Sequence, residues 1–400
     1  MNPSNISGDT SGDTIFDVII IGAGSVGVPT ALALAQKKIK VLVIDSLASP
    51  GQGQNKRAIG GIRATHSDKG KIATSLRSIE IFSTWKEIHG DDIGWMQNGY
   101  SFPAYTDKDA KMLQELMKIQ AAFNLEIDWL SPKEYQEIVP GINRVNLVGS
   151  TYSPKDGSAS PLLAINAFYF KSLEYGARYR FKEKVTQIFI KSDTEVKVTT
   201  DRGTYRAAKV INAAGNYARR IGQMVDLDLP VEPDSHEGAI TEPVQRFFGP
   251  MIVDLRPSRD PATEDSTNYY FYQNNEGQVI FCLTPKRLIK GTASESTSTF
   301  LPQVAKRMVT LFPKLANLKV RRTWRGQYPM TPDGFPIVGA TKKYPNFINA
   351  VGMCGQGYML GPGLGELLSR IVTQELTEED LDVLKHFTLY RDFSGVEHFK

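Results

Sequence analysis

The stretch from Asp17 to Asp45, which reads DVIIIGAGSVGVPTALALAQKKIKVLVID, constrains the fold more than any other part of the chain. Its apolar run Val18 to Ile21 is too short for a helix and predicts a strand buried on both faces. The pattern G-x-G-x-x-G follows, and then come an alanine- and leucine-rich helix, a second apolar strand from Lys40 to Ile44, and Asp45. This order of elements predicts a βαβ unit.

The three glycines of this unit predict a dinucleotide site. Gly22 allows a tight turn, Gly24 lets the backbone approach a pyrophosphate, and Gly27 allows close helix packing. The helix N-terminus points free N–H groups at the phosphates, and Asp45 stands where a carboxylate accepts hydrogen bonds from ribose hydroxyls. Strand, helix, strand and acid accompany the glycines within about thirty residues, so the alternative of a glycine turn in an ordinary α/β unit is the weaker one.

Composition narrows the class of protein further. With 400 residues and 41% hydrophobic content, the chain is long enough for two globular domains. The net charge of +4 from 47 basic and 43 acidic residues gives little support to nucleic-acid binding. The two cysteines, Cys282 and Cys354, lack C-x-x-C spacing, so neither a disulfide framework nor a metal site is predicted and a cytoplasmic setting is expected.

The first fourteen residues are polar and carry no apolar core typical of a signal peptide, so a flexible tail is expected there. No apolar run approaches the ~20 residues that a membrane-spanning helix needs. No membrane span is therefore predicted, and association with a membrane surface stays open.

Further along the chain, periodicity predicts an alternation of helices and strands. The spacing of apolar residues and the turn signals predict these elements: helices at 69–89, 109–123, from Ser131-Pro132, and at 161–175; strands near 178–190, 195–200 and 209–212; a strand-rich region at 231–283 with a hairpin turn across Asn274 to Gly277; and a helix that begins near Gly361.

Three other segments are expected to meet the nucleotide. The loop after Asp45 carries Lys56, Arg57 and Arg63 among glycines, and its alternative is a solvated surface loop. Small residues at 213–215 follow a predicted strand, and a glycine-rich segment at 352–365 breaks another strand. Close approach of backbone to a ligand explains these small residues, with tight helix–sheet packing as the alternative for the last segment.

These pieces are separated by strand-rich insertions, so one domain is assembled from discontinuous segments. The predicted fold class is α/β, with a doubly wound, mostly parallel, Rossmann-like domain and a second α+β domain that contains an antiparallel sheet. The expected boundaries are 15–92, 145–224 and 326–400 for the nucleotide-binding domain, and 93–144 and 225–325 for the substrate domain.

Five motifs taken together resemble the flavin-dependent amine and amino-acid oxidoreductases of the D-amino-acid oxidase superfamily. They are VIIIGAGSVG with Asp45, NKRAIGGIR, INAAGNYA, WRGQYPMTPDGFPIVG and GMCGQGYMLGPGLGE, in the family's order and spacing and over nearly the whole chain. The pattern is most similar to the β subunits of heteromeric sarcosine oxidase and L-proline dehydrogenase, with the glycine oxidase type further away.

The resemblance implies that FAD is the cofactor, bound without a covalent link. The residues that it implies for cofactor binding are Gly22, Gly24, Ser25, Val26, Gly27, Asp45, Ser46, Arg57, Ala58, Gly60, Gly61, Ile62, Val185, Ala213, Ala214, Gly215, Gly355, Gln356, Gly357, Tyr358 and Met359. Backbone N–H groups at the start of the last helix would then stabilise negative charge on the reduced flavin.

The reaction that the resemblance implies is removal of a hydride from the carbon that bears an amine, which yields an imine that water hydrolyses. Arg63 is the candidate for binding a substrate carboxylate, because a guanidinium offers two parallel donors. Tyr270 is the candidate that closes over the substrate, with Tyr269 and Tyr272 as competitors, and Gln356 completes the predicted catalytic set.

Departures from the family pattern leave the substrate open. Tyr328 stands where glycine oxidase-type enzymes have an arginine, while Gln356 and Met359 replace a histidine and a lysine of the monomeric sarcosine-type enzymes. Arg325 is a candidate second anchor for a carboxylate. The strand from Gln278 to Leu283 lacks the lysine of the oxygen-reactive enzymes, which favours a dehydrogenase over an oxidase.

Three functions therefore compete at this point. The first is oxidation of a small amino acid or secondary amine such as sarcosine, proline or an N-substituted glycine. The second is oxidation of a 2-hydroxy acid or a glycerol phosphate on the same fold. The third is a flavin-bearing subunit that passes electrons to a second, electron-accepting subunit. An NAD-dependent dehydrogenase would leave the middle and terminal glycine segments without a purpose.

Overall fold

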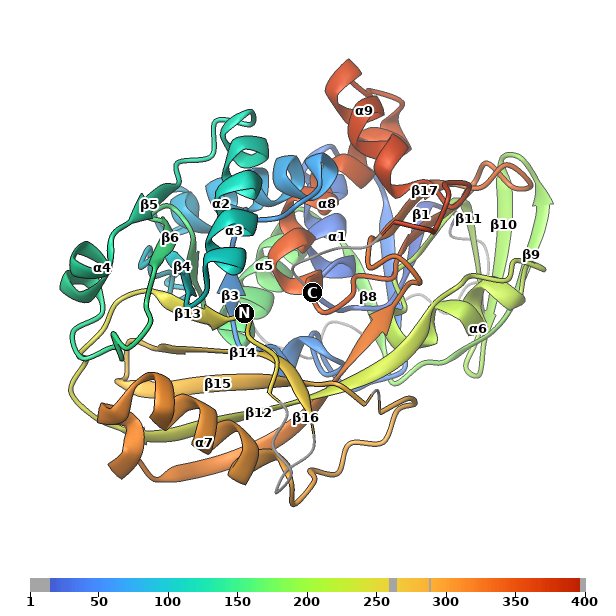
Figure 1. The fold of residues 1–400 in the computed structure, drawn as a ribbon. Coiled ribbons are helices and arrows are strands. Elements are labelled where there is room, and N and C mark those ends of the chain that lie inside the picture. Colours follow the sequence, from blue (N-terminus) through green and yellow to red (C-terminus); the bar gives the residue numbers. More distant parts are fainter. Residues whose placement is uncertain (1–14, 259–264, 288, 396–400) are drawn as a thin grey trace.

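Two large sheets form the body of the molecule, and a computed structural model describes them over residues 15–258, 265–287 and 289–395. The tail expected at residues 1–14 lies outside the described part of the chain. In Figure 1 helices α1, α5 and α8 lie in the centre, strands β1, β9, β10 and β11 of the first sheet lie to their right, and strands β12, β15 and β16 of the second sheet lie below. The α/β fold class predicted from the sequence is confirmed.

The first sheet has a parallel centre. Its main path is β17 (Ile337–Ala340), β18 (Phe347–Val351), β11 (Thr204–Asn212), β1 (Ile15–Ile21), β2 (Val41–Asp45) and β8 (Arg178–Phe181). Every pair from β18 to β8 is parallel. The remaining two strands, β10 (Glu195–Thr200) and β9 (Val185–Ser192), continue antiparallel from the first half of β11.

Strand β1 shows why this sheet is buried on both faces. Val18 and Ile20 are fully buried against the helices α1 (Gly27–Gln36), α2 (Lys69–His89), α5 (Pro161–Glu174) and α8 (Gly357–Thr373). Ile19 and Ile21 point to the opposite face, where β9, β10 and α6 (Ala218–Gln223) complete a second apolar cluster. Alternate side chains of a strand face opposite sides, so a continuous apolar run is what two covered faces require.

The second sheet is antiparallel except where β13 pairs with β4. Its order is β16 (Val320–Met330), β12 (Glu232–Pro243), β15 (Gln278–Pro285), β14 (Ser266–Gln273), β13 (Met251–Asp254), β4 (Tyr100–Ala104), β6 (Gly149–Ser153) and β5 (Asp128–Leu130). Helix α7 (Phe300–Leu311) buries its apolar face in the cluster that includes Phe271 and Phe281 of this sheet.

Shorter elements complete the fold. They are the ribbon of β3 (Gly61–Ile62) with β7 (Gly157–Ser158), the helices α3 (Asp107–Ala121), α4 (Pro132–Ile138) and α9 (Glu378–Phe387), and the 3₁₀ turns η2 (Asn55–Arg57), η3 (Gly215–Tyr217) and η4 (Pro313–Asn317). Ser131 caps α4 by accepting a hydrogen bond from the Glu134 N–H, as its place before Pro132 predicts.

Two predicted elements differ from the structure. The strand expected at 178–190 is divided into β8 and β9, because Lys182 between them has a left-handed φ of 56°. The last helix begins at Gly357 and not near Gly361, so Pro362 lies inside it. The glycines that suggested a later start serve packing instead: a Cβ on Gly361, Gly363 or Gly365 would collide with the backbone of α1, α2 or the turn before α1.

The strand pairing also bears on the expected domain boundaries. Strand β6 lies beyond the boundary expected at residue 144 but pairs with β4 and β5 of the second sheet. Strand β16 runs across the boundary expected at residue 325 and pairs with β12 along its whole length. The division of the chain into domains at these points stays a prediction, with both strands better grouped with the second sheet.

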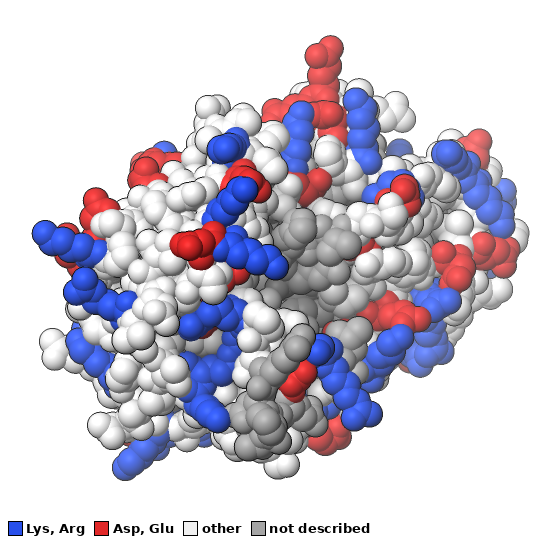
Figure 2. All heavy atoms as spheres, viewed as in Figure 1, with Lys and Arg blue, Asp and Glu red and all other residues white. Residues whose placement is uncertain are grey.

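The surface carries no strong segregation of charge on the face shown in Figure 2, where basic and acidic side chains are interspersed. Within the described ranges, none of the helices combines the length and the apolar character needed to cross a bilayer.

Candidate functional site

A large cavity of about 770 Å³ runs between the two sheets and takes its lining from both. From the first sheet's side come the β1–α1 turn, the end of β2, residues 213–217 and the turn before α8. From the second sheet come side chains of β4, β12, β13, β14, β15 and β16. Segments from the start, middle and end of the chain therefore meet around one space.

The β1–α1 turn is shaped for a pyrophosphate. Gly22 has a φ of 111°, and a Cβ there would overlap the carbonyl of Ala213. A Cβ on Gly27 would overlap the carbonyl of Gly22, so both positions need glycine for packing. A Cβ on Gly24 would meet no atom of the described residues within 4 Å, and Gly24 lines the cavity. The space above Gly24 fits the close backbone approach of a dinucleotide.

Asp45 lies at the cavity where β2 ends. One carboxylate oxygen accepts a hydrogen bond from the Ala23 N–H at 2.7 Å, and the other accepts one from the Leu47 N–H at 2.8 Å. These bonds hold the carboxylate against the glycine turn. Its contact with a ribose stays a prediction.

The segment around η2 is bound to β16 of the second sheet and, through Asn55, to the start of α5 beside the first sheet. The Arg57 guanidinium donates to the side-chain oxygen of Gln327 at 2.8 Å, and the Trp324 indole donates to the Arg57 carbonyl at 2.8 Å. The Gln327 N–H donates to the side chain of Gln54 at 2.8 Å. Arg57 thus serves as a bridge between sheets as well as part of the lining, and it does not belong to a solvated surface loop.

The turn before α8 forms another part of the lining. Cys354 and Gly355 both have left-handed φ values, of 48° and 82°, and a Cβ on Gly355 would overlap the ring of Tyr328. Gln356, Gly357, Tyr358 and Met359 follow on the cavity, so the N-terminus of α8 lies at the cavity as expected.

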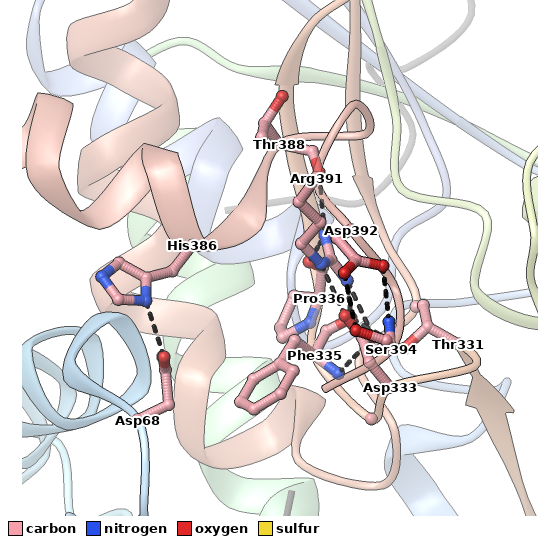
Figure 3. A network of polar contacts seen from close by, with 12 residues as sticks. Asp68, Thr331, Asp333, Phe335, Pro336, His386, Thr388, Arg391, Asp392 and Ser394 are labelled. Carbon is pink, nitrogen blue, oxygen red and sulfur yellow. Dashed lines mark hydrogen bonds and ion pairs between the residues drawn. The ribbon is translucent and has the colours of Figure 1, made fainter. Parts of the chain in front are cut away.

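An ion pair between Arg391 and Asp333, here called the brace, holds the loop at 331–336 that follows β16 (Figure 3). Arg391 donates to both carboxylate oxygens of Asp333, at 2.7 and 3.0 Å, and to the carbonyls of Phe335 and Pro336. Burial acts to raise the pKa of Asp333, but the hydrogen bonds and charge of Arg391, together with hydrogen bonds from the Phe335 N–H and the Thr331 hydroxyl, hold that pKa below its usual value. Thr331, in the same loop, lies 3.3 Å from the Cys354 sulfur, which connects the brace to the cavity.

Arg63 is buried, with 7% of its surface exposed, and lines the cavity. Its guanidinium donates to the Thr65 carbonyl, and Nη1 lies 3.3 Å from Nδ1 of His66. The guanidinium carbon lies 5.9 Å from the ring centre of Phe102, which also lines the cavity. A cation in this position can bind an anion with little competition from water.

Tyr270 and Tyr328 form a hydroxyl pair on the second sheet. Their oxygens lie 2.8 Å apart, and both residues line the cavity with Cys282. The His236 ring packs on Tyr328 with ring centres 4.0 Å apart. Burial raises the pKa of both tyrosines well above its ordinary value and raises that of Cys282 to about 11. These groups are therefore protonated at neutral pH and can donate hydrogen bonds.

Most of the residues proposed from the sequence come together around this cavity. All the cofactor-site residues line it except Gly27 and Ile62, which are buried behind it. The three proposed catalytic residues line it as well. Tyr269 and Tyr272 do not: the Tyr269 hydroxyl donates to the Arg307 carbonyl, and the Tyr272 hydroxyl donates to the Ile59 carbonyl.

Arg325 also lies outside the lining, with Nη2 3.9 Å from the Glu237 carboxylate, so its expected role as a second anchor is not supported by its place. Sequence reasoning assigned no role to several lining residues that are scattered along the chain: Gln54, Glu183, His236, Asn268, Cys282, Trp324 and Gln327. The WRGQY motif, in which Trp324 and Tyr328 fall on the same face of a strand, was the one available signal.

Comparison with known proteins agrees with this geometry. Human mitochondrial dimethylglycine dehydrogenase is 24% identical over 384 residues, which cover 91% of this chain but only 43% of that protein. Sarcosine oxidase subunit beta of an Arthrobacter species is 24% identical, with 90% of this chain and 87% of that protein covered. The crystal structure of L-proline dehydrogenase from P. horikoshii superposes with a TM-score of 0.85 at 28% identity, covering 94% of this chain and 97% of that one.

The chain thus spans less than half of the human relative's length. A family model described as FAD dependent oxidoreductase matches residues 17–371, which include both sheets and every segment around the cavity. The G-x-G-x-x-G turn, the middle strand and the turn before α8 all lie within that match. The chain belongs to the DAO family of FAD-dependent oxidoreductases.

Proposed function

We propose that this protein oxidises the C–N bond of a small amino acid or secondary amine. The observation that carries the proposal is that a buried guanidinium, Arg63, and a protonated hydroxyl pair, Tyr270 and Tyr328, line the same cavity as the dinucleotide turn. Such a set can bind a carboxylate together with an amine or a hydroxyl on the same carbon. The names of three relatives, which refer to dimethylglycine, sarcosine and L-proline, support an amine as the group that is oxidised.

FAD, bound without a covalent link, supplies the two-electron acceptor for the hydride. The open space above Gly24 and the backbone around 213–215 and 355–357 would hold it. N–H groups at the start of α8 would stabilise negative charge there.

The chain's own residues then bind and orient the substrate. Arg63 pairs with the substrate carboxylate, and a hydroxyl of the Tyr270–Tyr328 pair donates a further hydrogen bond. Both tyrosines stay protonated because burial raises their pKa, so neither removes the amine proton. An ammonium substrate therefore loses its proton to water before it reacts. As the neutral amine, its nitrogen lone pair forms the C=N bond while the carbon gives up the hydride, which FAD would accept. Phe102 and Val253 supply an apolar wall that excludes water.

The decisive experiment is anaerobic bleaching of the flavin spectrum by a panel of amines and hydroxy acids. Sarcosine, L-proline and N-substituted glycines are expected to bleach it, whereas lactate and glycerol 3-phosphate are not. Bleaching by the hydroxy compounds alone would support the alternative oxidation of an alcohol. A purified protein that binds no FAD and shows no flavin spectrum would overturn the proposal.

Replacing Arg63 tests the anchor. Arg63→Ala is expected to lower kcat/KM for a carboxylate substrate about 100-fold, because a buried charge-assisted pair contributes roughly 2–5 kcal/mol. The rate with dimethylamine, which has no carboxylate, should change much less. Arg321→Ala on the exposed start of β16 is the matched control and should leave both rates unchanged. Equal losses for both substrates would contradict the assignment.

We further infer that electrons leave the protein through a partner subunit or dye. The relative from Arthrobacter is named as a subunit, and strand β15 carries no lysine at the cavity. Turnover with an artificial dye should exceed turnover with oxygen by at least tenfold. Equal rates in air would instead identify an oxidase.

A further inference from the structure

Asp156 is a fully buried carboxylate that the reaction described above does not use. It lies between β6 and β7, with none of its surface exposed. Strand β7 begins at the next residue and pairs with β3, with Ile62 opposite Gly157. Asp156 and Arg63 are therefore brought to the same end of the two-stranded ribbon.

Both carboxylate oxygens of Asp156 bind the turn that carries Arg63. Oδ1 accepts a hydrogen bond from the Ala64 N–H at 2.8 Å, and Oδ2 accepts one from the Thr65 hydroxyl at 3.3 Å. The Arg63 guanidinium in turn donates to the Thr65 carbonyl. The carboxylate thus holds the backbone against which the guanidinium is oriented.

The other polar groups around this carboxylate are few among the described residues. Arg63 acts on it through its charge, the Ser153 side chain is within hydrogen-bonding reach, and the charge of Asp156 in turn acts on the Tyr100 hydroxyl. His66 lies beyond Arg63, with Nδ1 facing the guanidinium and Nε2 3.0 Å from the Ser75 hydroxyl. Burial raises the pKa of Asp156 to about 7, against the lowering effect of the Ala64 N–H and Arg63. Both the charged and the neutral form are therefore populated near neutral pH.

We propose that Asp156 is a positioning residue that fixes the 63–65 turn and, through its charge, sets how tightly Arg63 binds a substrate carboxylate. The proposal rests on the role of Arg63 given above. An ionised Asp156 offsets part of the positive charge of Arg63 and repels an incoming anion, whereas a neutral Asp156 does neither. Carboxylate binding and protonation of Asp156 are then coupled, each favouring the other.

The test measures binding of acetate to the FAD-loaded protein by calorimetry at pH 6 and pH 8. Acetate is ionised at both pH values, so only the protein's protonation changes. In the wild type the Kd should rise about fivefold from pH 6 to pH 8, the lower end of usual coupling between two sites. Binding of acetamide, the neutral analogue, should show no such rise.

Asp156→Asn keeps the shape of the side chain and removes its charge. We expect this variant to bind acetate at both pH values with the affinity that the wild type has at pH 6. Asp193→Asn, at an exposed position, is the control and should retain the wild-type pH dependence. If acetate binding to Asp156→Asn still depends on pH, the proposal is overturned. It is also overturned if the pH dependence disappears in His66→Gln, where Asp156 is intact.

Two further measurements keep the proposal separable from its premise. If Arg63→Ala binds acetate as the wild type does, the assignment of Arg63 as the carboxylate anchor is wrong. If Arg63→Ala loses acetate binding while Asp156→Asn keeps the wild-type pH dependence, only the role of Asp156 is wrong. Should Asp156→Asn not fold, calorimetry of the wild type in two buffers with different ionisation enthalpies at pH 7 decides. Net proton uptake on acetate binding is expected, and none would overturn the coupling.

Discussion

The two sides of the cavity are made from different parts of the polypeptide. On the side of the first sheet the lining is largely backbone and small residues, namely the turn at Gly22 to Val26, residues 213–215 and the turn at 352–357. On the side of the second sheet it consists of large side chains such as Tyr270, Trp324 and Tyr328. A phosphate-rich cofactor is bound through N–H groups that every residue has, so glycine is selected for access. A small substrate is distinguished by side-chain groups, which a strand presents at every second position.

Replacing glycines on the cofactor side should have the largest effects, on stability for one glycine and on FAD affinity for the other. Gly27→Ala places a Cβ against the Gly22 carbonyl, so the free energy of unfolding should fall by more than about 3 kcal/mol. Gly24→Ala meets only open space, so the apoprotein should keep its thermal midpoint while its affinity for FAD falls tenfold or more. Thermal unfolding with and without FAD measures both. Equal losses of stability in the two variants would show that Gly24 serves packing and not access.

The brace behind the cavity should show the next largest effect. Arg391→Ala leaves Asp333, which is 1% exposed, without its ion pair, and should lower the free energy of unfolding by about 2 to 3 kcal/mol. The pKa of Asp333 is lowered in the folded protein, so this stabilisation is present above the unfolded-state pKa of about 4 and is lost as pH falls further. Chemical denaturation at pH 7 and pH 3 should show the difference from wild type shrinking at the lower pH. A difference that does not depend on pH would point to lost packing instead.

Removing a single hydroxyl on the substrate side should have the smallest effect, and it should lower activity without changing FAD binding. Tyr270→Phe removes one partner of the 2.8 Å hydroxyl pair and should lower kcat/KM about tenfold, the value of one hydrogen bond of ~1.4 kcal/mol. FAD content should not change. Tyr269→Phe on the same strand is the control, because its hydroxyl bonds to the Arg307 carbonyl and lies outside the cavity lining. Loss of FAD from Tyr270→Phe would mean that the two sides of the cavity are not separate in function.

The elements that follow local rules were predictable. Helix α2 has the expected bounds of 69 to 89, the hairpin turns where Asn274 to Gly277 predicts, and β1, α1 and β2 form the expected βαβ unit. The start of α8 was not predictable from local rules. Gly361, Gly363 and Gly365 are poor helix formers alone and are tolerated only through contact with α1 and α2. Helix propensity was overridden by tertiary packing there.

The same division holds for the cavity. The sequence by itself determined the cofactor side, since the glycine spacing of a βαβ unit is a local requirement of backbone geometry and phosphate binding. Only the tertiary structure decided which of three neighbouring tyrosines faces the cavity, that Arg325 pairs with Glu237, and that Asp156 lies under the turn of Arg63. These contacts join residues as far apart as 58 and 92 positions, through sheet order and register that no local pattern specifies.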